Sequence, residues 1–146
     1  MKLIDLYKPF IGTESKFLDK YSQETQDIAQ NFWNGLNSSC IFFVVSLLFL
    51  SVFVCVYYFT AYNNIPGRHY KRSHWVGAYV VSVLLTFFVT VALGYMLNNT
   101  ALNGSGYLIW YIAFGNLIYS AIIFGILSCI WFLWLPTNAY RLIGKN

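Results

Sequence analysis

Three long apolar runs, none of which contains Asp, Glu, Lys, Arg or His, constrain the fold of this chain most strongly. They cover residues 40–62, 75–97 and 108–135. At about 1.5 Å of rise per residue, a helix of ~20 residues crosses the roughly 30 Å hydrocarbon core of a bilayer. A backbone in lipid must satisfy its own amide groups, and the runs lack the alternation of membrane β-strands. The sequence therefore predicts an all-α membrane protein with three transmembrane helices.

Charge divides the chain into three parts. All of its carboxylates lie within the first 27 residues, at Asp5, Glu14, Asp19, Glu24 and Asp27. Only 10% of the residues are charged, against about 25% in an average soluble domain. We therefore expect an extramembrane N-terminal segment over residues 1–39, a three-span membrane bundle over residues 40–135, and a short basic tail over residues 136–146.

The positions of Lys and Arg beside the spans predict the orientation. Arg68, Lys71 and Arg72 lie between the first and second spans, and Arg141 and Lys145 lie in the tail. The loop between the second and third spans carries no charge. Because basic residues flanking spans favour the cytoplasmic side, we expect the N-terminus outside and the C-terminus in the cytoplasm. The membrane we expect is the cytoplasmic (inner) membrane of a bacterium.

The N-terminal segment has the pattern of an amphipathic helix over residues 13–36, followed by a polar break before the first span. Its polar face has mixed charge, which disfavours a helix drawn to anionic lipid. We expect this helix to dock on a protein partner, either another copy or a different subunit; rest at the lipid surface is the alternative. The apolar stripe that would dock consists of Phe17, Leu18, Tyr21, Ile28, Phe32 and Leu36.

Small and polar residues within the second and third spans are candidate helix-packing residues. In lipid, small residues let helices approach closely, and a buried amide joins helices by hydrogen bonds. The second span has small residues at a spacing of four, and the third carries an amide and a weaker set of small residues. The simplest interpretation is that these two spans pack on each other within the chain, and contact between copies is the alternative. For the amide, a ligand-binding or pore-lining role is a third interpretation. The candidates are Ala78, Ser82, Thr86, Thr90 and Gly94, with Asn116, Ser120, Ala121 and Gly125.

A basic loop lies between the first and second spans. Such a cluster sets topology and attracts anionic headgroups, at about 1 kcal/mol per Lys or Arg; docking of an acidic partner is the alternative. Adjacent cations disfavour a metal site, and the footprint is small for a nucleic acid. We expect no metal, cofactor or nucleic-acid partner. The loop residues are Arg68, His69, Lys71, Arg72 and His74.

The sequence carries no motif that predicts a reaction. Membrane enzymes and ion-coupled transporters generally place ionisable side chains within the bilayer, and these spans have none. We therefore expect a non-catalytic membrane subunit that anchors or assembles a larger complex through helix packing and its N-terminal helix. The alternative is a self-oligomerising protein that permeabilises membranes, holin-like or an effector. The three-span layout, with the N-terminus outside and a basic tail inside, is similar to that of one class of phage holins.

Overall fold

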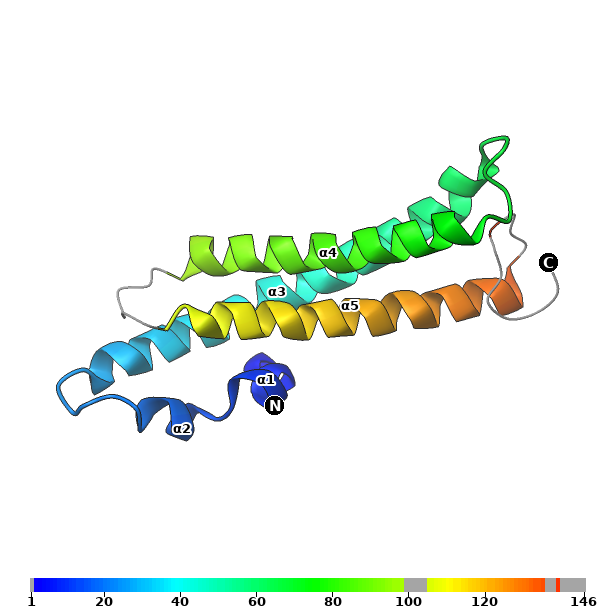
Figure 1. Cartoon of the computed structure of the whole chain (residues 1–146). Coiled ribbons are helices and arrows are strands. Elements are labelled where there is room, and N and C mark those ends of the chain that lie inside the picture. The colour runs from blue at the N-terminus through cyan, green and yellow to red at the C-terminus, as the bar shows by residue number, and fades with distance from the viewer. Residues whose placement is uncertain (1, 99–104, 136–138, 140–146) are drawn as a thin grey trace. The chain divides into compact units, whose positions relative to one another are not determined.

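A computed structural model of the chain describes residues 2–98, 105–135 and 139, and it contains helices and no strand over these residues. Three of the helices are long and apolar enough to cross a membrane, which confirms the predicted all-α class with three candidate spans. Figure 1 shows the elements in chain order. They are η1 (Leu3–Tyr7), α1 (Lys8–Ile11), α2 (Glu14–Leu18), α3 (Gln26–Thr60), η2 (Tyr62–Asn64), α4 (Arg72–Leu97) and α5 (Tyr107–Trp134).

The chain forms two compact units, and each long helix contributes one segment to each unit. Unit 1 comprises Met1–Ser46 and Phe87–Asn116. Unit 2 comprises Leu47–Thr86 and Leu117–Asn146. Unit 1 therefore holds η1, α1 and α2 with the start of α3, the end of α4 and the start of α5. Unit 2 holds the end of α3, η2, the start of α4 and the end of α5.

The single amphipathic helix predicted over residues 13–36 is not present. α2 ends at Leu18, and α3 begins only at Gln26. Between them, Thr25 Oγ1 donates a hydrogen bond of 3.1 Å to the carbonyl oxygen of Ser22. Short hydroxyl side chains can hydrogen-bond to nearby backbone groups and so compete with the backbone hydrogen bonds of a helix. The turn lets α2 lie beside the start of α3, where the Phe17 and Trp33 ring centroids are 5.4 Å apart (Figure 1).

The predicted polar break before the first span is also absent, because α3 continues through it as one helix of 35 residues. Ser38 Oγ donates a hydrogen bond of 3.0 Å to the carbonyl oxygen of Asn34, one turn earlier. Ser39 Oγ does the same to Gly35, at 2.9 Å. These hydroxyls are thus satisfied within the helix rather than in a turn. α4 and α5, by contrast, match the predicted spans to within three residues at either end.

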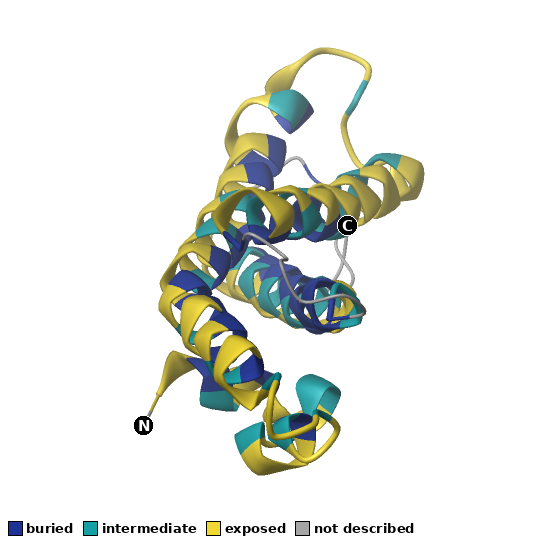
Figure 2. Cartoon of the chain, turned by 90° about the vertical axis from the view of Figure 1, so that its left-hand side faces the viewer, coloured by how far each residue is buried: buried dark blue, intermediate teal, exposed yellow. Residues whose placement is uncertain are grey.

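The three long helices have apolar exposed faces and partly polar buried ones. Exposed positions along α3 include Phe42 and Phe49, which are 53% and 63% exposed. Buried positions include Ser51, Thr90 and Asn116, all of which are fully buried. Figure 2 shows the exposed and buried faces of the helices. This distribution suits helices surrounded by lipid, where polar side chains are satisfied by contacts between helices.

Candidate functional site

Asn116 on α5 joins four segments of unit 1. Its side-chain oxygen accepts a hydrogen bond of 2.8 Å from the Tyr7 hydroxyl. Its Nδ2 donates to Thr90 Oγ1 at 2.9 Å and to the carbonyl oxygen of Phe43 at 3.2 Å. Both amide hydrogens and the amide oxygen are therefore paired, as burial of an amide requires. We call these four residues the Asn116 cluster.

A second polar cluster joins the three long helices of unit 2 around Ser120. Ser51 Oγ on α3 donates a hydrogen bond of 2.9 Å to Ser120 Oγ on α5. From α4, Ser82 Oγ and Thr86 Oγ1 each lie 3.3 Å from the same oxygen. Thr86 Oγ1 also donates to the carbonyl oxygen of Ser82, at 2.8 Å. These four hydroxyls, the Ser120 cluster, are all fully buried.

The small-residue ridge of the second span lies on the buried side of α4. Ser82 and Thr86 contact Ser120 in unit 2, and Thr90 contacts Asn116 in unit 1. These polar contacts of the ridge lie within the chain. Its two outer members are Ala78, which is half-buried, and Gly94, which is buried.

Gly94 allows α4 and α5 to approach closely in unit 1. A Cβ at this position would overlap the Cγ2 atom of Ile109, which is itself fully buried. Ala121 and Gly125, the weaker small residues of the third span, are only half-buried. A Cβ at Gly125 would meet nothing within 4 Å, so this glycine is not required for a close approach.

Most of the apolar stripe of the N-terminal segment is covered by the chain itself. The ring centroid of Phe17 lies 5.1 Å from that of Tyr21 and 6.1 Å from that of Phe32. Phe17, Phe32 and Leu36 are buried and Leu18 and Tyr21 half-buried, which leaves Ile28, 46% exposed, as the most open member of the stripe. Burial raises the pKa of the Tyr21 phenol, with a further contribution from nearby Tyr107. The stripe therefore packs largely within unit 1 instead of presenting an open docking face.

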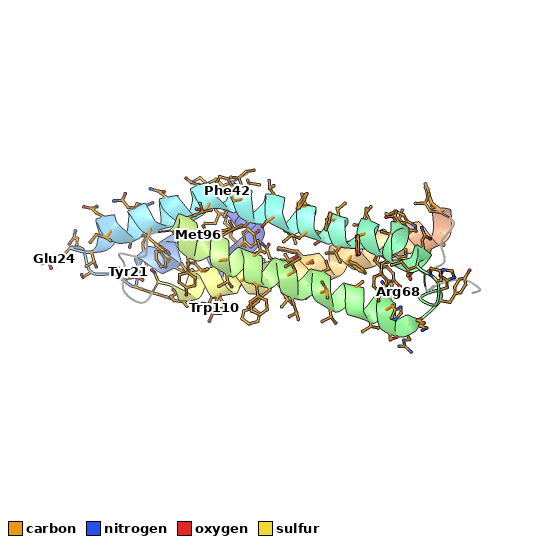
Figure 3. The ribbon with its side chains drawn as sticks, turned by 90° about the horizontal axis from the view of Figure 1, so that it is seen from above. Tyr21, Glu24, Phe42, Arg68, Met96 and Trp110 are labelled. Atoms are coloured by element: carbon orange, nitrogen blue, oxygen red, sulfur yellow. The ribbon has the colours of Figure 1, made fainter. Side chains whose placement is uncertain are left out.

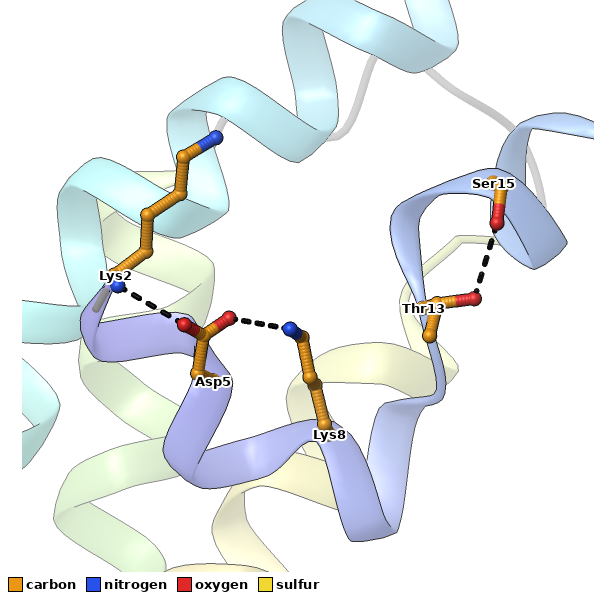
Figure 4. Close-up of polar contacts among 5 residues, drawn as sticks. All are labelled: Lys2, Asp5, Lys8, Thr13 and Ser15. Atoms are coloured by element: carbon orange, nitrogen blue, oxygen red, sulfur yellow. Dashed lines mark hydrogen bonds and ion pairs between the residues drawn. The ribbon is translucent and has the colours of Figure 1, made fainter.

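Two electrostatic contacts organise the start of the chain (Figure 4). Asp5 accepts a hydrogen bond of 3.0 Å from the backbone nitrogen of Lys2, and its other oxygen lies 2.8 Å from Lys8 Nζ. The hydrogen bond from Lys8 holds the pKa of Asp5 below its ordinary value of 3.8. Beyond α1, the hydroxyls of Thr13 and Ser15 lie 3.2 Å apart. The contacts of Asp5 with Lys2 and Lys8 close the turn that contains Tyr7.

The basic loop of unit 2 is built around a stack of three side chains. The Arg68 guanidinium lies over the Tyr62 ring, 4.4 Å from its centroid, and the Tyr62 and His74 rings meet edge to face at 5.4 Å. Figure 3 labels Arg68 in this loop. The remaining basic-loop residues, His69, Lys71 and Arg72, are exposed. Arg68 and His74 thus pack on Tyr62, whereas His69, Lys71 and Arg72 are exposed, with the His69 ring edge-on to that of Tyr70.

The sequence interpretation missed three members of the polar clusters: Tyr7, Phe43 and Ser51. Ser51 lies in an apolar run, and its hydroxyl was a usable signal, since a buried hydroxyl needs a partner. Phe43 contributes only its backbone carbonyl, which no sequence pattern marks. Tyr7 gave no such signal, because its partner is 109 residues away in the sequence.

Neither a metal-binding group of side chains among the described residues nor a match to a known protein suggests a function for these clusters. Within residues 2–98, 105–135 and 139, no three His, Cys, Asp or Glu side chains gather as a group that could hold a metal ion. Comparisons with protein-family models, curated proteins and solved structures find no match to the chain. The proposals below therefore rest on its residues and contacts alone.

Proposed function

We propose that this chain is a non-catalytic integral membrane subunit that anchors or assembles a larger membrane protein complex. One observation carries the proposal: the polar side chains of the long helices bond to one another inside the chain, whereas the outward faces are apolar. The Asn116 and Ser120 clusters use their amide and hydroxyl groups for helix packing. Because these amide and hydroxyl groups hydrogen-bond between helices, they support a structural role for the chain.

The outward face of α3 in unit 2 offers a surface for another transmembrane helix. Phe49, Phe53 and Tyr57 are spaced by four residues and are 50–63% exposed. Their rings stack in series, with centroid distances of 5.9 and 6.4 Å. A stacked aromatic row loses little side-chain entropy when a partner packs on it, because each ring is already held by its neighbour.

The N-terminal segment offers a second surface, and it is acidic. Glu24, labelled in Figure 3, is exposed at the turn before α3. Asp27 is exposed in the first turn of α3, and Asp19 is exposed just after α2. Because the apolar stripe is largely covered, we infer that a partner of this segment meets its charged face. The partner we propose is a basic extramembrane surface of another subunit, or of another copy.

The orientation we propose has the N-terminus outside and the basic loop and tail in the cytoplasm of a bacterial cell. The distribution of Lys and Arg supports it, since the loop over residues 65–74 carries three basic residues and no acid. The acidic face would then meet partners outside the cytoplasmic membrane.

Co-purification tests the proposed function. A tagged copy expressed in its own membrane and extracted in mild detergent should bring down defined chains in a fixed ratio. Phe53→Ala should weaken that recovery by removing the middle ring of the row. Phe88→Ala, which removes a ring of similar exposure from α4, is the matched control. Recovery of a clean monomer from wild type would contradict the proposal, and abrupt loss of membrane potential on expression would favour the permeabilising alternative.

A further inference from the structure

A groove between α3 and α4 in unit 2 is amphipathic along its length. It has a volume of about 380 Å³. Val54, Ala78 and Val81 line the part that lies further along the two helices, toward the interior of the spans. Tyr62, Ser73 and His74 line the part next to the basic loop. One end of the groove is therefore hydrocarbon-like, and the other end is polar and aromatic.

The polar end of the groove favours a negatively charged ligand, and in the described part of the chain no acidic side chain lines the groove. The Nδ1 atom of His74 is buried and has no hydrogen-bond partner within the part of the chain that the structure describes. Arg68 does not itself line the groove, but its guanidinium lies over the ring of Tyr62, which lines the groove and also contacts His74. Ser73 and His74 lie in the first turn of α4, where the helix dipole favours an anion. The positive charge of Arg68 and the helix dipole both favour an anion, and the unpaired His74 nitrogen leaves a hydrogen-bonding position open at the same end.

We propose that this groove binds one anionic phospholipid, with an acyl chain along Val54, Ala78 and Val81 and its phosphate between His74 and Arg68. An anionic membrane lipid carries an apolar chain and a negatively charged headgroup in one molecule, which matches the apolar and basic ends of the groove. A zwitterionic lipid would fill the apolar end equally but would bring its own cation to the basic end. A free phosphate would use the polar end alone.

Lipid titration of the purified chain in a nonionic detergent, followed by native mass spectrometry, tests the proposal. Dioleoyl phosphatidylglycerol should bind about fivefold more tightly than dioleoyl phosphatidylcholine, the difference expected for one basic residue at a headgroup. Arg68→Gln should remove that preference. Arg72→Gln, which removes the same charge from an exposed position close by, is the matched control and should retain most of it.

A second pair of variants tests the apolar end of the groove. A Cβ at Gly77 would meet nothing within 4 Å, so Gly77→Leu can enter the groove without a backbone clash. Displacing two or more lipid methylenes should weaken binding of the anionic lipid at least about tenfold. Gly125→Leu is the matched control, because it adds the same side chain at another open position on α5. Far-UV circular dichroism checks that each variant keeps its helices.

Three results would overturn the proposal. Equal affinity for the two lipids would mean that the groove does not select an anionic headgroup. Unchanged lipid binding by a helical Gly77→Leu would place the lipid elsewhere. Displacement of the anionic lipid by millimolar inorganic phosphate would identify a site for free phosphate. None of these results depends on whether the chain co-purifies with other subunits.

Discussion

The Tyr7 hydroxyl donates a hydrogen bond of 2.8 Å to the side-chain oxygen of Asn116, and so connects the start of the chain to the buried face of α5. Phe10 lies beside it, 3.0 Å from where a Cβ on Gly115 would be. η1 and α1 are thereby seated in unit 1 by one polar and one apolar contact. The first residues of the chain are part of its packed structure.

Tyr7→Phe should loosen the N-terminal segment with little change to the rest of the chain. The substitution removes one hydroxyl and leaves the Asn116 oxygen unpaired, at a cost of about 1–2 kcal/mol. Limited proteolysis in detergent should cut residues 1–12 faster in the variant. Tyr111→Phe removes a hydroxyl from an exposed residue of the same unit and should leave the cleavage rate unchanged. Equal cleavage of both variants would mean that the Tyr7 bond does not hold the segment.

Ser120→Ala should destabilise unit 2, because one hydroxyl serves Ser51, Ser82 and Thr86 together. We expect a loss of about 0.6–1.7 kcal/mol, the range measured for hydrogen bonds between membrane helices. Unfolding by sodium dodecyl sulfate, followed by tryptophan fluorescence, measures it. Ser46→Ala is the control, since the Ser46 hydroxyl bonds to the carbonyl oxygen of Phe43 in its own helix. A cost no greater than that of the control would show that the cluster adds nothing to stability.

Gly94→Ala should destabilise the contact of α4 with α5 in unit 1 by about 1–3 kcal/mol, because the new methyl group overlaps Ile109. Ile109→Ala removes the overlapping atoms, so the double variant should be more stable than the sum of the two single costs predicts. Gly125→Ala is the control, with open space around its Cβ. Additive costs in the same unfolding assay would contradict a close approach at this point.

Lys8→Gln should raise the pKa of Asp5 toward its ordinary value of 3.8, because the Lys8 hydrogen bond is the main cause of the lowering. In wild type, a lowered pKa means that the carboxylate stabilises the folded turn above pH 3.8. That stabilisation is lost as the pH falls through the folded pKa. The carboxyl carbon shift of Asp5, followed by NMR against pH, gives the value directly. Lys16→Gln in α2 is the control, and an equal shift from it would exclude a specific role for Lys8.

Cysteine labelling of intact cells tests the orientation. In a background with Cys40, Cys55 and Cys129 replaced, Glu24→Cys should react with an impermeant maleimide, and Lys71→Cys should react only after the membrane is broken. Both positions are exposed, so reagent access is set by the membrane alone. A cysteine at Ser105 would report poorly, because that side chain is fully buried. The reverse labelling pattern would overturn the proposed topology.

The parts of the fold that follow from local hydrophobicity could be predicted from the sequence. α4 and α5 begin and end close to the limits of their uncharged runs, because transfer of charged residues into lipid is costly. The spacing of Ser82, Thr86 and Thr90 marked one face of α4 as a candidate packing face, and these three residues are buried. These features depend on residues within one helix, and a helical period is readable from the sequence alone.

The features that the sequence did not reveal depend on contacts between distant segments, or on local competition between side-chain and backbone hydrogen bonds. Asn34 and Gly35 are ordinary break signals, yet they remain helical in α3, where Ser38 and Ser39 bond back to their carbonyl oxygens. Thr25 falls in the middle of the helix predicted over residues 13–36, yet it lies in the turn that separates α2 from α3. In both cases the side-chain hydrogen bonds span only three or four residues, and the sequence pattern does not say whether they will accompany a helix or a turn.

The uninterrupted course of α3 has a geometric consequence. At 1.5 Å per residue its 35 residues measure about 52 Å, while the hydrocarbon core of a bilayer is only about 30 Å thick. Roughly 20 Å of the helix must therefore extend beyond the lipid tails or be accommodated by tilt. Through this helix, without an intervening turn, the chain passes from its acidic N-terminal segment to the segment that carries the basic loop.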